Sequence, residues 1–152
     1  MYKYIMFSLL LFSLLQLSCS SLHSNFNESD FELVNEQYHI YIEKTATNNQ
    51  KLYVMVELPN RIEAFVNCIF NNNMQYVGLV ATIKSYKFYV YKEAFKCNVG
   101  YCNGLIKYDK KHIYLESTLC AVSHELCHLW LYKYYNDQHT DPRGSKCDAC
   151  YK

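Results

Sequence analysis

The sequence carries almost no net charge and no long run of like charges. Fifteen Lys and Arg residues balance fourteen Asp and Glu residues, so the formal net charge is +1. Proteins that attract nucleic acid electrostatically present a basic patch or stripe. We therefore expect no nucleic-acid partner.

The sequence also lacks internal repeats, signs of a second domain and an apolar run long enough to cross a bilayer. The chain has 152 residues, which suits one domain, since domains typically contain about 100–150 residues. Hydrophobic residues make up 51% and charged residues 19%. That balance can fill a single core and argues against a disordered chain.

The most apolar stretch, Ile5–Leu17, is shorter than the roughly 20 residues that span a membrane. It matches the hydrophobic region of an export signal. Ser18-Cys19 follows it and resembles a bacterial lipobox, although Gln16 replaces the usual aliphatic residue. We predict a signal peptide over 1–18 and lipidation of Cys19. A plain signal peptide cut nearby, or an uncleaved anchor, is the alternative.

These features predict an exported protein. It would be a membrane-anchored lipoprotein in the periplasm or at the cell surface, or otherwise secreted. The polar stretch 19–36 is interpreted as a flexible tether, and 37–152 as the folded domain.

Eight cysteines are many for a chain of this length, and in an exported domain they predict disulfides. Seven follow Cys19, so at least one of them is a free thiol or bonds to another molecule. Their pairing stays open at this point. Two other interpretations are a redox pair at Cys147-x-x-Cys150, and a zinc site made by Cys97, Cys102, Cys147 and Cys150.

Hydrophobic patterning predicts an α+β fold. Helices are expected over 61–70 and 117–135, the second one capped by Ser117 or Thr118, with Asn136-Asp137 as its stop. Pro59 is expected to break the chain before the first helix. Strands are expected over 38–42, 51–58, 76–83, 86–91 and 113–115, and loops over 97–104 and 139–152.

The second predicted helix contains the motif HExxH, as His124-Glu125-Leu126-Cys127-His128. Residues i and i+4 lie on one helix face, so the two imidazoles can bind one Zn²⁺. Glu125 is then offset toward the open side of the metal. There it can act as general base and take a proton from a water activated by the zinc.

HExxH on a helix after a short strand resembles the zincin metallopeptidases. The resemblance covers roughly Ile113 to Asp141 and implies that the strand 113–115 borders the substrate cleft. The motif is also similar to the SprT-like branch and to small exported bacterial metallopeptidase domains. SprT-like proteins have Gly after a third His, where this chain has Thr140. The metzincin continuation is missing, because Leu131 and Tyr134 occupy its Gly and His positions.

A catalytic zinc needs a third protein ligand, and His139 is the best candidate. A turn at Asn136-Asp137 could bring it back to the motif. Asp141, Asp137 and Glu116 are alternatives as ligand. Asp137 or Asp141 could instead accept a hydrogen bond from an imidazole N–H and so orient the ring.

Two functions follow from this pattern. The first is an exported zinc-dependent peptidase acting on a protein or peptide substrate. It would be a small zincin-like, disulfide-stapled domain, in which a mixed or antiparallel sheet packs on the active-site helix. The alternative is a non-catalytic, disulfide-rich lipoprotein for metal binding or interaction, which would have no need of a base at Glu125.

Overall fold

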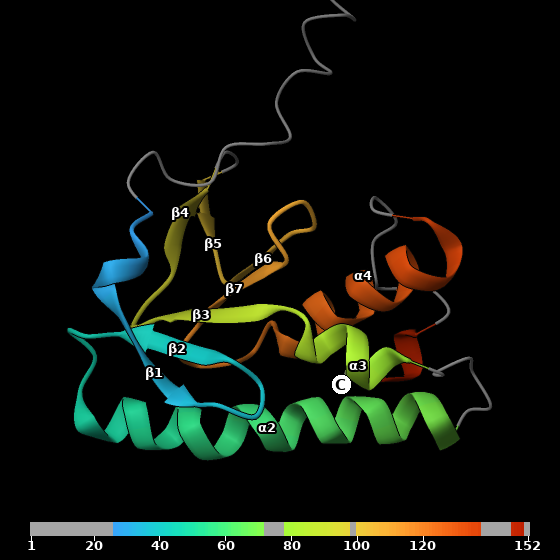
Figure 1. Ribbon diagram of the computed structural model, residues 1–152, viewed down its shortest axis with the longest axis horizontal. Coiled ribbons are helices and arrows are strands. Elements are labelled where there is room, and N and C mark those ends of the chain that lie inside the picture. The colour runs from blue at the N-terminus through green and yellow to red at the C-terminus, as the bar shows by residue number, and fades with distance from the viewer. Residues whose placement is uncertain (1–25, 72–77, 98–99, 138–146, 151–152) are drawn as a thin grey trace, which may run out of the picture.

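The computed structural model describes residues 26–71, 78–97, 100–137 and 147–150. In these residues the chain is a mixed α+β domain (Figure 1). The predicted signal peptide 1–18, Cys19, His139 and Asp141 lie outside them. The elements are η1 (Glu28–Asp30), β1 (Phe31–Asn35), β2 (Ile40–Glu43), α2 (Asn48–Asn71), α3 (Leu79–Lys84), β3 (Lys87–Tyr91), β4 (Phe95–Cys97), β5 (Gly100–Cys102), β6 (Gly104–Lys107), β7 (His112–Glu116), α4 (Val122–Tyr135) and η2 (Asp148–Cys150).

The main sheet has five strands in the order β1-β2-β3-β7-β6. The three inner strands β2, β3 and β7 run parallel, whereas β1 and β6 join the two edges antiparallel. Strands β4 and β5 form a separate hairpin that leads into β6. Strand β1 falls within the predicted tether 19–36, and Phe31 in it is buried. The folded domain therefore begins before residue 37.

One face of the main sheet packs on the helices and forms the larger core. Neighbouring strands place apolar residues opposite one another, as in the row Ile40, Phe88, Ile113 and Ile106. Helices α2 and α4 supply the other side of this core. The opposite sheet face carries a second, aromatic cluster built around Tyr89 and Tyr114, covered by Phe26, Phe31 and Phe95.

The predicted strand over 51–58 and the predicted break at Pro59 are wrong. Helix α2 runs without interruption over Asn48–Asn71 and contains that proline. A proline in a helix interior removes a backbone hydrogen bond. The helix continues because one stripe of side chains packs on the core at helical spacing. Its buried members are Val54, Leu58, Ile62, Phe65 and Ile69.

A capping box starts α2. The backbone N–H of Gln50 donates to Thr47 Oγ1 at 3.3 Å, and Gln50 Oε1 accepts from the backbone N–H of Thr47 at 3.0 Å. These reciprocal bonds satisfy backbone donors that the first helical turn leaves without partners.

The predicted strand over 76–83 is also wrong, because Leu79–Lys84 is the short helix α3, in which Leu79 and Ile83 are buried four residues apart.

Helix α4 begins at Val122, five residues later than predicted, because Leu119 has a positive φ of 60°. The hydroxyl of Ser117 donates to the carbonyl of Lys92 and does not cap the helix. The predicted stop is confirmed, since Asn136 adopts the left-handed conformation typical of a C-terminal cap.

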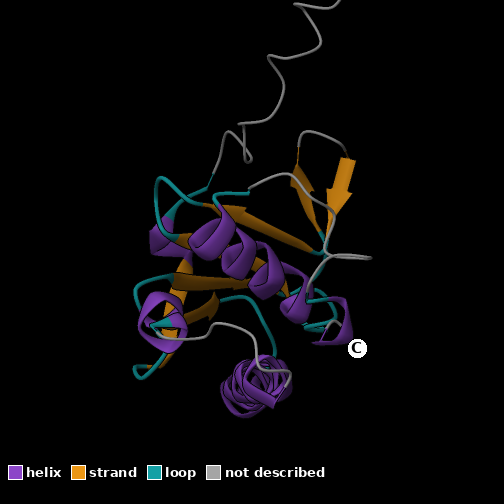
Figure 2. Ribbon diagram, turned by 90° about the vertical axis from the view of Figure 1, so that its right-hand side faces the viewer, coloured by secondary structure: helices purple, strands orange, loops and turns teal. Residues whose placement is uncertain are grey.

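Three disulfides staple the domain, namely Cys68–Cys150, Cys97–Cys102 and Cys127–Cys147. The four-cysteine zinc site and the redox pair are therefore wrong, because Cys147 and Cys150 bond to partners on α4 and α2. Among the cysteines that the structure describes, Cys120 is the one with a free thiol, and it is exposed. Cys150 in η2 is thus bonded to α2, and Cys147, directly before η2, is bonded to α4. Helix α2 is seen end-on at the bottom of Figure 2, below the strands of the main sheet. In the part of the chain that the structure describes, no helix is both long and apolar enough to cross a membrane.

Candidate functional site

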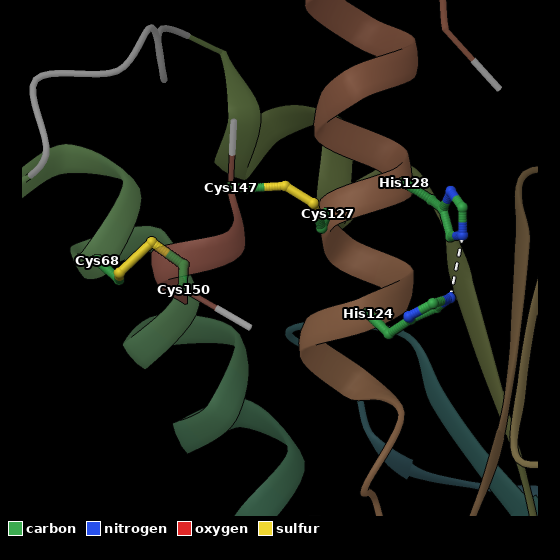
Figure 3. The surroundings of a disulfide bond; sticks show 6 residues. All are labelled: Cys68, His124, Cys127, His128, Cys147 and Cys150. Carbon is green, nitrogen blue, oxygen red and sulfur yellow. Dashed lines mark hydrogen bonds between the residues drawn. A yellow bond between two sulfur atoms is a disulfide. The ribbon is translucent and has the colours of Figure 1, made fainter. Parts of the chain in front are cut away.

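Helix α4 presents the two histidines of the motif on one side and its core residues on the other. Nε2 of His124 lies 3.1 Å from Nε2 of His128, and the ring planes are 77° apart. Both side chains are partly exposed. Figure 3 shows them on the side of α4 away from Cys127, whose disulfide to Cys147 points toward the core. Ring nitrogens from successive turns of α4 thus converge at a partly buried position.

Glu125 lies between these histidines in sequence but its side chain is buried, with only 5% of the residue exposed. Burial raises the pKa of its carboxyl group to about 8, because a low-dielectric setting disfavours the charged form. The carboxyl packs against the backbone of Gly104 in β6, so closely that no side chain would fit there.

The edge of the sheet beside the site is β6 and not β7. The expectation that 113–115 would border the cleft is therefore wrong, because β7 lies between β3 and β6. Strand β7 is not at the edge because β6, which precedes it in the chain, pairs with it as a hairpin and takes the edge position. Strand β6 packs against α4. Gly104, which lies close to the Glu125 carboxyl, belongs to the segment 97–104 that was predicted to be a loop.

Sequence reasoning missed two residues near the motif. Gly104 is one, and a glycine within a strand often marks a close approach of another group. Tyr108, just after β6, is the other. The centroid of its ring lies 4.4 Å from the ring centroid of Tyr132, a residue that follows His128 by one helical turn. Burial raises the pKa of Tyr108, and the nearby Glu125 carboxyl raises it further.

The third metal ligand is the part of the predicted site that the described residues do not supply. Among them no group of three His, Cys, Asp or Glu side chains could hold a metal ion. Asp137 and Glu116, both described, therefore do not complete a triad with the two histidines. The preferred candidate His139, and Asp141, fall within 138–146, outside the described residues.

The chain has no significant similarity to known proteins in the three comparisons made: no family model matches it, and neither a curated protein nor a solved structure does.

Proposed function

We propose that this chain is an exported zinc-dependent peptidase, in which His124 and His128 hold the metal and Glu125 is the general base. The observation that carries the proposal is the convergence of two imidazole Nε2 atoms, 3.1 Å apart, on a helix in which the residue after the first histidine, Glu125, has a buried carboxyl group. Two ligands bound to one tetrahedral zinc at about 2.0–2.1 Å lie about 3.4 Å apart. The donor pair thus suits zinc in both chemistry and spacing.

A bound zinc ion would lower the pKa of a coordinated water toward about 7. Glu125 follows the first histidine directly and its carboxyl is held against β6. A bound zinc ion would favour the charged form of this carboxyl, because a nearby opposite charge lowers a carboxyl pKa. The carboxylate could then take up a proton and later return it to a leaving amine. A module that only holds metal has no use for a carboxyl group in this place.

The sheet edge favours a peptide as substrate. Strand β6 is bonded to β7 on one side and has no strand on its other side among the described residues. Extended peptides bind such edges through backbone hydrogen bonds. A peptide along β6 would lie beside the helix that carries the motif, since β6 and α4 pack together.

Metal content and cleavage together test the proposal. Protein made in an oxidising compartment should contain about one zinc per chain by elemental analysis, and His124→Ala or His128→Ala should abolish it. Wild-type protein should cleave members of an internally quenched peptide library. Protein without zinc would refute the metal assignment. Zinc with no cleavage of any library member would favour the non-catalytic metal-binding module.

A further inference from the structure

A row of inward-facing side chains crosses the sheet and ends at a glycine. Ile42 pairs with Val90, Val90 with Leu115, and Leu115 with Gly104 at the β6 edge. Residues directly opposite one another in neighbouring strands point to the same face. The first three residues are buried in the helix-facing core. Gly104 therefore occupies a position whose side chain would point toward α4.

Glu125 fills the place of that missing side chain. A Cβ atom at Gly104 would lie 2.5 Å from Oε1 of Glu125, 2.8 Å from its Cγ and 2.7 Å from Cβ of Ala121. The carboxyl end of Glu125 could rotate away. Cβ of Ala121 is fixed to the helix backbone, so the first turn of α4 or strand β6 would also have to move. No other described glycine has any atom this close, since Gly78 and Gly100 face open space.

We infer that Gly104 is a positioning residue for the general base: its lack of a side chain lets β6 approach α4 and holds the Glu125 carboxyl in place. This rests on the proposed peptidase function. A side chain at position 104 would displace the carboxyl. Where strand β6 takes up the rest of the movement, the partly exposed His124 and His128 keep their places on α4. A shift of about 1 Å in a catalytic group can cost about 10²-fold in rate.

The central test is Gly104→Ala, assayed with the quenched peptide that wild-type protein cleaves fastest. We expect wild-type zinc content and a loss of at least about 30-fold in kcat. In the Glu125→Gln background the same substitution should reduce the residual rate less than threefold, because groups that act as one unit are non-additive. Ile113→Val, in the inner strand β7, controls for general destabilisation, and Ala121→Gly controls for changes at the helix start. Both should retain at least one third of wild-type kcat.

A second readout measures the packing without any catalysis. Gly104→Ala should lower the melting temperature by about 5 °C, because overpacking destabilises by about 1–3 kcal/mol. In the Glu125→Ala background the loss should be at most half as large, since two of the three close contacts are then gone. If Gly104→Ala does not fold, Gly104→Ala with Ala121→Gly relieves the contact with the helix and keeps the one with the carboxyl. That variant should fold, bind zinc and remain at least about 30-fold slow.

Several results would overturn the inference. These are a folded Gly104→Ala protein with more than one third of wild-type kcat, loss of zinc in that variant, or an equal loss of rate in the Glu125→Gln background. The inference would also be overturned if Gly104→Ala lowered the melting temperature equally in the wild-type and the Glu125→Ala protein. A wild-type protein that binds zinc but cleaves no peptide would refute the peptidase itself, and the positioning role with it. The two failures are therefore distinguishable.

Discussion

Removing the disulfides one at a time should destabilise the domain in order of the chain length that each encloses. A disulfide restricts the unfolded chain, and the effect grows with the logarithm of the number of enclosed residues. The sequence separations are 82 for Cys68–Cys150, 20 for Cys127–Cys147 and 5 for Cys97–Cys102. The chain-entropy relation gives losses of about 4.5, 3.3 and 2.1 kcal/mol in the free energy of unfolding.

These losses are large for a single domain, whose total stability is about 5–15 kcal/mol. Cys68–Cys150 should matter most because it joins α2 to η2 and encloses every element from α3 to α4. Cys127–Cys147 lies within that same loop. Each pair is best replaced by two alanines, which leave no polar group in the core.

Guanidinium unfolding under non-reducing conditions measures the effect. Trp130 is the only tryptophan, is fully buried and contacts the rings of Tyr134 and Tyr135, so its fluorescence should report loss of the core. All variants should carry Cys120→Ala, which removes the exposed free thiol and should itself change stability by less than about 0.5 kcal/mol. Successive disulfides should differ by about 1.2 kcal/mol. Equal losses, or the largest loss from Cys97–Cys102, would refute the loop-entropy reasoning.

Three further predictions concern the site and export. Glu125→Gln should keep zinc but lose about 10²–10⁴-fold in peptide cleavage, because the amide cannot accept a proton; wild-type turnover would exclude Glu125 as the base. His139→Ala should weaken zinc binding severely and Asp141→Ala by only about 10–100-fold, as measured by competition with a chelator; an unchanged affinity in His139→Ala would exclude it as a ligand. Mass spectrometry of the native protein should find Cys19 as a lipidated N-terminus, and an intact 1–18 segment would contradict this.

The sequence alone is sufficient to predict an element or a site when the signal comes from residues close together in the chain. Helix α4 can be predicted because its buried residues recur at helical spacing and Asn136 can adopt the left-handed conformation that ends it. The i, i+4 spacing of His124 and His128 by itself places both on one helix face. The seven cysteines after Cys19 indicate disulfides together with at least one free thiol or a bond to another molecule, and among the described residues the free thiol is that of Cys120.

The preference of individual residues for strand or helix is misleading where tertiary packing outweighs it. Residues 51–58 are rich in β-formers, yet they are helical because Val54 and Leu58 continue a stripe that extends to Ile69. Strand propensity reflects how a side chain packs more than an intrinsic backbone preference. The Thr47-x-x-Gln50 capping box is a readable signal for the start of this helix, and it points to a helix where the β-formers point to a strand.

Only the tertiary structure decided what surrounds the motif. Which cysteines pair depends on which elements meet in space, so the separations of 82 and 20 residues could not be anticipated. The same holds for the strand beside α4, because sheet order is set by long-range pairing. The contact between Gly104 and Glu125 joins residues far apart in the chain. It exists because β6, at the end of a row of core side chains, meets the first turn of the helix where no side chain fits between them.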